Sequence, residues 1–286
     1  MAGGPMIAGL LHTVPALAPT FDALVADALP GAALPGAALP GATAAGVSRE
    51  HVVDAWMLET AIAEGVTPAV RERVASHLRH LAESGADAIL VTCSSIGEAA
   101  EEAAAQLPIP VVRVDAAMAA EAARRAGASG SGSPRIVVLA TNTATLGPTT
   151  RLIEREAAAQ GIHATVTATV VEGAAAARAG GDQARHDRLI AEAVRSAAAP
   201  ADGSEPAAVL VLAQASMAAA AEAAGVDLPM LTSPAGGVAR LVEALTPSDP
   251  GTPDASADRA ARPGSGGTSA AELATGRGTA HSGATS

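Results

Sequence analysis

Short runs of apolar, often β-branched residues alternate along the chain with longer amphipathic segments. The runs are apolar throughout, which is typical of strands buried on both faces of a parallel sheet. We expect such strands at 6–11, 88–92, 110–114, 136–140, 209–213 and 229–232, and two more within HVVDAW (51–56) and ATVTATVV (164–171). Helices are expected at 17–28, 67–83, 97–106, 116–126, 148–159, 183–198, 217–224 and 235–245. This alternation predicts an α/β fold built from βαβ units.

The two halves of the chain resemble each other. MIAGLLHTVPALAPTFDALV, from Met6, aligns with RIVVLATNTATLGPTTRLIE, from Arg135, and DAILVTCSS aligns with AVLVLAQAS. Both long segments run from a strand through a polar turn to Leu-[Ala/Gly]-Pro-Thr, where proline is expected to begin a helix. Chance similarity between alanine-rich segments is the alternative, and the shared order of elements favours duplication. We therefore infer two parallel-sheet α/β halves related by a pseudo-twofold axis, with the active site in the cleft between them.

The division of the chain follows from this duplication. The first half is expected to span 1–116, completed by 234–245, and the second half to span 117–233. A repeat rich in Pro and Gly at 29–46 interrupts the first half and is predicted to be a surface loop, because neither helix nor strand persists there. Residues 246–286 are mostly Gly, Ser, Thr, Pro and Ala, and we expect a disordered tail.

Composition excludes several classes of partner. The net charge of −11 at pH 7 argues against nucleic acids and anionic membranes as ligands. The chain has one Trp, one Phe and no Tyr, so it offers no aromatic platform for stacking bases. The N-terminus lacks the basic region of a signal peptide, so none is predicted. The sequence has no apolar run of about 18 residues that could span a membrane. With a single cysteine, no internal disulfide can form, and we expect a cytoplasmic protein.

Four polar turns follow predicted strands: HTVPA, TCSS, TNTAT and AQASM. Ligands of parallel sheets bind at the carboxyl ends of strands, so facing halves would direct these turns into one cleft. Small hydroxyl side chains and free backbone N–H groups can hold a carboxylate without Lys or Arg. The pattern predicts a site for a small acid.

Cys93 lies where a predicted strand meets a predicted helix. Ser95 and Glu98 have the spacing of a capping box, and a thiol just before a helix start is expected to favour the thiolate. The alternative is that Cys93 is a small buried hydrophobe. His12 could be a base, a hydrogen-bond donor to substrate, or a residue satisfied within its turn. No Cys/His cluster has the spacing of a metal site, and no phosphate loop is found, so neither metal nor cofactor is predicted.

These motifs resemble the aspartate/glutamate/hydantoin racemase superfamily over about residues 6–245, apart from the Pro/Gly loop. HTVPAL, LVTCSSIG, VLATNTAT and VLAQASMA carry the resemblance through their order and spacing. Members of that family are cofactor-independent isomerases of amino acid metabolism that do not use PLP. They typically place two cysteines, one from each half, on opposite faces of the substrate's acidic carbon. One thiolate removes the α-proton while the other thiol delivers a proton to the far face.

The resemblance also implies roles for individual residues. Cys93 corresponds to the first catalytic cysteine, and Ser94 and Ser95 to the polar residues that follow it. Thr13, Asn142 and Thr143 match the polar strand ends that line the cleft and bind substrate. A small carboxylate or amino acid is the expected substrate, and a homodimer is common in the family.

The second half departs from the family pattern. Gln214 stands where the second cysteine is usual, with Ser216 beside it as a further substrate-binding candidate. A carboxamide cannot act as an acid or base near pH 7, although it can donate and accept hydrogen bonds. Three functions follow: a racemase-like enzyme in which His12 or water replaces the missing partner of Cys93, a single-cysteine decarboxylase or lyase, or a non-catalytic protein that binds a small acid.

Overall fold

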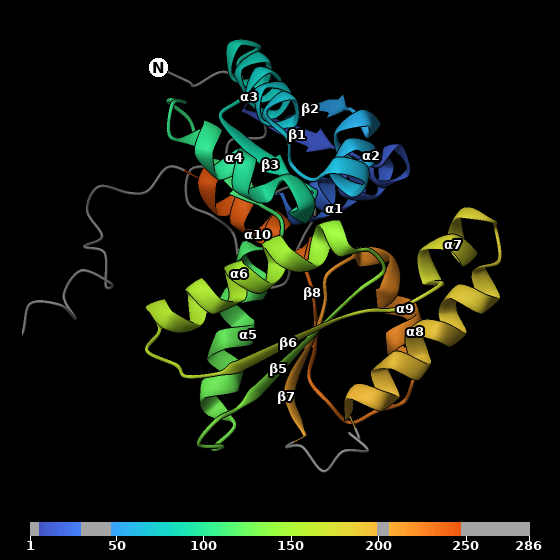
Figure 1. Cartoon of the computed structure of the whole chain (residues 1–286). Coiled ribbons are helices and arrows are strands. Elements are labelled where there is room, and N and C mark those ends of the chain that lie inside the picture. The colour runs from blue at the N-terminus through green and yellow to red at the C-terminus, as the bar shows by residue number, and fades with distance from the viewer. Residues whose placement is uncertain (1–5, 30–46, 199–205, 247–286) are drawn as a thin grey trace, which may run out of the picture. The chain divides into compact units, whose positions relative to one another are not determined.

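The computed structural model describes residues 6–29, 47–198 and 206–246, which contain two four-stranded parallel sheets (Figure 1). The first sheet has the order β2-β1-β3-β4, from β1 (Ile7–His12), β2 (Ser48–Val53), β3 (Ala88–Val91) and β4 (Val111–Arg113). The second repeats this order as β6-β5-β7-β8, from β5 (Arg135–Ala140), β6 (Thr165–Val170), β7 (Ala207–Leu212) and β8 (Met230–Thr232). The predicted α/β class with two parallel-sheet halves is confirmed.

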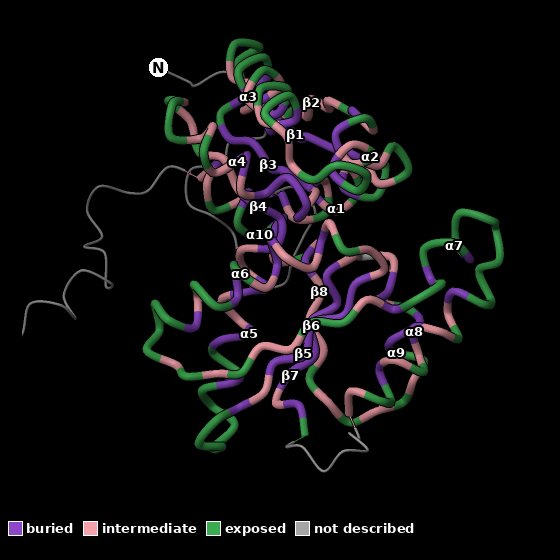
Figure 2. Tube along the Cα trace, viewed as in Figure 1, coloured by how far each residue is buried: buried purple, intermediate pink, exposed green. Residues whose placement is uncertain are grey.

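The apolar runs form the centre of each sheet, as Figure 2 shows by the burial of β1, β3, β5 and β7. Leu10, Leu11, Ile89 and Leu90 are fully buried although neighbours in sequence point to opposite faces of the sheet. Burial on both faces requires helices on both faces, which explains why these strands do not alternate between apolar and polar residues.

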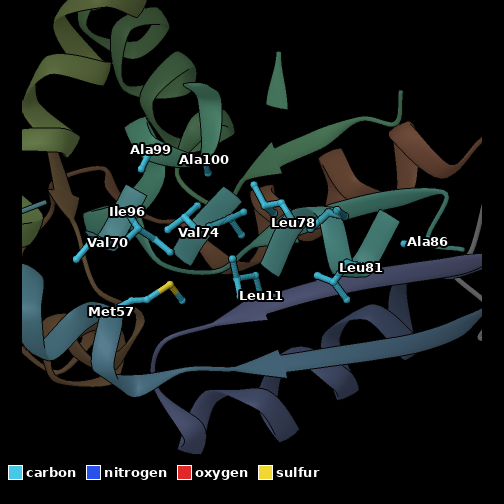
Figure 3. Close-up of a cluster of buried hydrophobic side chains, with 12 residues drawn as sticks. Leu11, Met57, Val70, Val74, Leu78, Leu81, Ala86, Ile96, Ala99 and Ala100 are labelled. Atoms are coloured by element: carbon cyan, nitrogen blue, oxygen red, sulfur yellow. The ribbon is translucent and has the colours of Figure 1, made fainter. Parts of the chain in front are cut away.

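Five helices cover the first sheet. Leu11 and Ile89 share one face with side chains of α2 (Ala55–Glu64), α3 (Pro68–Glu83) and α4 (Gly97–Ala104), and Figure 3 shows this cluster around Leu11, Val74 and Leu78. On the other face, Leu10 and Leu90 pack with α1 (Ala18–Ala28) and α10 (Pro234–Leu245). The Thr67 hydroxyl accepts from the Val70 N–H, with proline next in the chain, so α3 begins where the sequence predicts.

The second sheet is covered in the same way. One face packs against α5 (Ala116–Ala128) and α6 (Thr143–Ala159), and the other against α7 (Ala174–Ala179), α8 (Gln183–Ala198) and α9 (Ala218–Glu222). Helices α5 and α10 each follow the last strand of one half yet share a core cluster with the sheet of the other half. The division into 1–116 with 234–245 and 117–233 stays a prediction. The packing of α10 against the first sheet agrees with placing 234–245 in the first half.

The junction of α10 with the end of β4 has no room for a side chain at Gly237. A Cβ there would lie 2.8 Å from both the Cα and the carbonyl oxygen of Val114. We expect Gly237→Ala to lower the free energy of unfolding by about 1–3 kcal/mol, because overpacking against backbone outweighs the helix propensity of alanine.

Denaturant unfolding of Gly237→Ala, beside Gly147→Ala as a control, measures this effect. A Cβ at Gly147 would meet only the flexible end of Arg151, so that variant is expected to be as stable as the wild type or more stable by up to about 1 kcal/mol. Equal stability of Gly237→Ala and the wild type would contradict the close approach of α10 to Val114.

Three sequence expectations on helices and strands were wrong. HVVDAW is not one strand, because β2 ends at Val53 and α2 begins at Ala55. Helix α6 begins at Thr143 and not at 148, because the Asn142 side chain accepts from the Thr145 N–H and caps it earlier, leaving Pro148 inside the helix. Helices α2 and α7 were not predicted at all.

Two further expectations fall outside the described residues: the Pro/Gly loop from residue 30 on, and the tail beyond Thr246. Among the helices that are described, none combines the length and the apolar character needed to cross a bilayer.

Candidate functional site

A cavity of about 400 Å³ lies at the carboxyl ends of the central strands, between the connections that leave the two sheets. Its polar lining consists of Thr13, Thr92, Cys93, Ser94, Ser95, Thr141, Asn142, Thr145, Arg178, Gln214, Ser216 and Ser233. Its apolar lining consists of Val14, Leu17, Phe21, Leu58, Ala175, Ala179 and Ala213. This is the place where parallel sheets bind ligands, because strand ends and helix starts converge there.

Cys93 lies between β3 and a 3₁₀ turn, Ser94–Ile96, that leads directly into α4. Its backbone is extended, with φ −127° and ψ 116°, and its half-buried side chain lines the cavity. Burial raises the pKa of the Cys93 thiol above its ordinary value. The Thr13 hydroxyl, the N–H groups of Ser95 and Ile96, and the Ser95 hydroxyl act in the opposite direction by favouring the thiolate, with a smaller combined effect.

The expected preference for a thiolate is therefore corrected. The N–H groups at the helix start do face the sulfur, as the sequence indicates, but the loss of solvent around the side chain has the larger effect on its pKa. The raised pKa of Cys93 favours the protonated thiol at neutral pH. Cys93 is thus ready to donate a proton, and it becomes a base only after losing one.

The polar residues around Cys93 are arranged to stabilise negative charge on sulfur. The buried Thr13 hydroxyl has no nitrogen or oxygen partner within the described residues, so it is free to donate to the sulfur. Ser94 and Ser95 are both buried in the turn that begins α4. Thr13, Ser94 and Ser95 therefore lie together with Cys93 on one wall, as the sequence predicted for their positions.

A hydrogen-bonded network joins this wall to the second half. Ser95 Oγ lies 3.1 Å from Thr145 Oγ1, which in turn donates to Asn142 Oδ1 at 3.0 Å. Thr145 uses its single hydroxyl proton in that bond, so Ser95 donates to Thr145 while Cys93 is a thiol, and its one hydroxyl proton turns to the sulfur when Cys93 is a thiolate. Nearby, Arg151 of α6 donates to both carboxylate oxygens of Glu98 on α4, at 2.7 and 2.8 Å. These bonds fix the two walls of the cavity relative to each other.

Gln214 lines the opposite wall with a fixed orientation. Its Oε1 accepts from the backbone N–H of Thr141 at 2.6 Å and from the Thr141 hydroxyl at 2.8 Å. A backbone N–H can only donate, so the contacting atom must be the oxygen. The two Nε2 protons of Gln214 remain for a ligand, which makes this side chain a hydrogen-bond donor in the cavity.

Asn142 repeats this arrangement. Its Oδ1 accepts from the N–H and the hydroxyl of Thr145, at 3.1 and 3.0 Å, which leaves the Nδ2 protons for a ligand. Ser216 lies beside Gln214 on the cavity wall, as expected, whereas Thr143 is exposed and does not line the cavity. Thr145, two residues later, takes that place because α6 begins at Thr143 and its first turn directs residue 145 inward.

His12 does not reach the cavity wall. It is fully buried, its Nδ1 lies 2.9 Å from Thr92 Oγ1, and its Nε2 lies 3.0 Å from His51 Nδ1. Burial and the neighbouring His51 lower the pKa of His12 from 6.5 to about 4, so this ring is neutral at physiological pH. Both ring nitrogens are occupied, and His12 can act on a ligand only through Thr92, which lines the cavity.

Arg178 is a charged cavity residue that was not predicted from the sequence. It lies on α7 with its side chain exposed, and it brings a permanent positive charge to a cavity that otherwise offers neutral donors. Its segment, VEGAAAARAGGD, follows the predicted strand at 164–171, but it has no polar turn motif like those after the central strands. Only the packing of α7 against α8 at the edge of the second half brings Arg178 to the site.

Comparison with known proteins gives the chain its family. The model of the Asp/Glu/Hydantoin racemase family matches residues 35–241, whereas a comparison with curated protein sequences gave no match. A candidate Asp/Glu racemase from Yersinia pestis is similar in structure, with a TM-score of 0.61, 15% identity, and coverage of 84% of this chain and 99% of that one.

Two further solved structures share the fold. An aspartate racemase of Picrophilus torridus has a TM-score of 0.57 and 13% identity over 84% of this chain and 94% of that one. A glutamate racemase of Bacillus anthracis has a TM-score of 0.54 and 16% identity over 83% of this chain and 80% of that one. At these identities the neighbours show the fold alone, and the family model carries the assignment. The chain belongs to the Asp/Glu/hydantoin racemase family and is an enzyme of the racemase class.

Proposed function

We propose that the chain catalyses proton transfer at the acidic α-carbon of a small carboxylic acid or amino acid, with Cys93 as the acid/base. The observation that carries this proposal is the pairing of one thiol, surrounded by donors that stabilise its thiolate, with an opposite wall of N–H donors across a 400 Å³ cavity. Such a cavity fits a small anion whose reacting carbon lies against the sulfur.

The carboxylate of the substrate is held by the second half. Asn142 Nδ2 and Gln214 Nε2 have free protons, and Arg178 adds a positive charge to the same cavity. The Asn142 and Gln214 donors also stabilise the enolate-like charge that develops on the carboxylate when the α-proton leaves, whereas the exposed Arg178 acts on the carboxylate equally before and during the reaction. Asn142 and Gln214 therefore serve both substrate binding and carbanion stabilisation.

Without a second cysteine, a thiol can protonate the substrate carbon only on the face next to Cys93. Cys93 can remove and return a proton, but Gln214 cannot deliver one to the opposite face near pH 7. Exchange of the α-proton with retention of configuration is therefore expected to be faster than racemisation. Water that enters the cavity beside Gln214 is the remaining proton source for inversion.

A second candidate function is a one-face lyase reaction such as decarboxylation. Part of the cavity lining is apolar and includes Leu17, Phe21 and Leu58. A carboxylate placed there would be desolvated, which favours its loss as carbon dioxide, and Cys93 would then protonate the carbanion. A thiol whose pKa is raised by burial suits this direction of transfer.

Proton NMR in D2O tests these proposals together. The protein is incubated with small amino acids, hydantoins and substituted malonates, and Cys93→Ala is run in parallel. Loss of an α-proton signal supports carbanion chemistry, and a new product signal supports the lyase. If no compound exchanges or loses a carboxylate, the cavity binds small acids without turnover, and the proposal is wrong.

Arg178 supplies a prediction on substrate binding. Arg178→Met is expected to raise KM by about tenfold with little change in kcat, because an exposed charge that holds the carboxylate contributes equally to substrate and transition state. Arg185→Met, an exposed arginine outside the cavity on neighbouring α8, is the control and should leave KM unchanged. An unchanged KM in Arg178→Met would remove this residue from the binding site.

A further inference from the structure

Helix α7 forms part of the cavity wall although it belongs to the edge of the second half. It lies beside α8, and its residues Ala175, Arg178 and Ala179 line the cavity (Figure 1). Its remaining contact face, Ala174 and Ala177, is buried. One side of this helix therefore faces the protein interior, and another faces the ligand.

Few interactions hold α7 in place. Six residues are too few for a helix that is stable by itself. The chain enters α7 through Gly173 and leaves it through Gly181, whose φ angles of 77° and 79° lie in the left-handed region and separate the helix from its neighbours. Among the residues that the structure describes, none forms an ion pair with Arg178. The position of Arg178 therefore depends on how α7 packs against α8.

His186 of α8 supplies a hydrogen bond within that packing. The side chain is fully buried, and its Nδ1 lies 2.9 Å from the carbonyl oxygen of Ala174. A carbonyl oxygen can only accept, so the Nδ1–H of His186 is the donor. Ala174 lies four residues before Arg178, which is about one helical turn. This bond ties the backbone of α7 to α8 one turn away from the charged residue.

The second ring nitrogen of His186 indicates that stability is not what this side chain provides. Its Nε2 is buried and has no hydrogen-bond partner among the described residues. A buried polar atom without a partner lowers the free energy of unfolding, which offsets the gain from the bond to Ala174. A phenyl ring of nearly the same shape would avoid that cost. What the histidine adds over an apolar residue is the fixed position of α7.

We propose that His186 is a positioning residue for substrate binding, which holds α7 so that Arg178 stands at the cavity. This role rests on the proposed function, in which Arg178 binds the substrate carboxylate. His186 is not part of the cavity lining and acts on the ligand only through α7.

The alkylation of Cys93 tests this role without any substrate. Iodoacetate and iodoacetamide react with the same thiol, the only one in the chain, but iodoacetate alone carries a carboxylate. The ratio of their rate constants reports on positive charge at the cavity, because changes in the thiol itself cancel. We expect Arg178→Met to lower the ratio of iodoacetate to iodoacetamide by about fivefold. His186→Phe should lower it by a similar factor, because α7 then no longer holds Arg178 at the cavity.

Two control variants should keep the wild-type ratio. In His186→Asn, the side-chain N–H can take the place of Nδ1–H and donate to Ala174. Arg185→Met removes an equal charge from an exposed position outside the cavity. His186→Leu is a second apolar variant with the same expected loss, so the test does not depend on the folding of His186→Phe.

The double variant His186→Phe/Arg178→Met should have the same ratio as Arg178→Met alone, because both changes act through one charge. A wild-type ratio in the apolar variants of His186, beside a lowered one in Arg178→Met, would overturn the positioning role and leave the proposed reaction in place. A wild-type ratio in Arg178→Met would also overturn it, since Arg178 would then not act on anions at the cavity. The absence of α-proton exchange in the substrate screen would contradict the proposed reaction and leave these ratios unaffected.

Discussion

Cys93→Ala is expected to lower the rate of α-proton exchange by at least about 10³-fold, because a positioned acid/base contributes roughly 10² to 10⁴ in rate. Apart from Cys93 and Arg178, no titratable group is found among the described residues that line the cavity. Within the described lining, the remaining polar groups are hydroxyls and carboxamides, which do not ionise near pH 7. The loss should appear in kcat. Thermal unfolding of the variant should match the wild type, because the side chain is only half-buried and alanine leaves a small gap.

Thr143→Ala is a suitable control for this experiment. Thr143 was predicted to bind substrate, yet it is exposed and outside the cavity, so this variant should exchange at the wild-type rate. Retention of exchange in Cys93→Ala would remove the thiol from the mechanism. Loss of exchange in Thr143→Ala would show that the ligand extends beyond the cavity described above.

Gln214→Cys is expected to introduce racemisation, raising the rate of inversion by about 10²-fold over the wild type. The substitution places a second thiol across the cavity from Cys93, and one additional proton carrier is worth roughly 10² to 10⁴ in rate. The gain should lie at the low end, because Thr141 loses the carboxamide that now occupies its N–H and hydroxyl. Circular dichroism or chiral chromatography of a single enantiomer measures inversion directly.

Gln214→Ser removes the same hydrogen bonds without supplying a thiol. If it inverts substrate as fast as Gln214→Cys, the gain comes from water admitted to the cavity and not from the new acid. If neither variant inverts, residue 214 does not face the reacting carbon, and the one-face reaction needs another explanation.

The central strands β1, β3, β5 and β7 were predictable from the sequence because their burial is nearly complete. A run such as 89–91 is apolar on both faces only if helices cover both faces of the sheet. In the structure all three residues are buried. Helix α7 could not be predicted, since five alanines and one arginine between glycines have no periodic apolar face. Its position depends on packing against α8, which no local pattern encodes.

The candidate site was predictable where it follows strand ends. Thr13, Cys93, Asn142 and Gln214 come from equivalent turns of the duplicated halves, so topology alone brings them together. The direction of the pKa shift of Cys93 was not predictable. The helix start is visible in the sequence, whereas the desolvation that outweighs it depends on tertiary packing around the sulfur.

The most direct test of Cys93 as the acid/base is a titration of exchange activity against alkylation. The chain has one cysteine, so each iodoacetamide adduct counted by mass spectrometry reports on Cys93 alone. With a substrate found by NMR, the rate of α-proton exchange is expected to fall in proportion to the alkylated fraction and to reach the level of Cys93→Ala at one adduct per chain. Full exchange by fully alkylated protein would contradict a catalytic thiol.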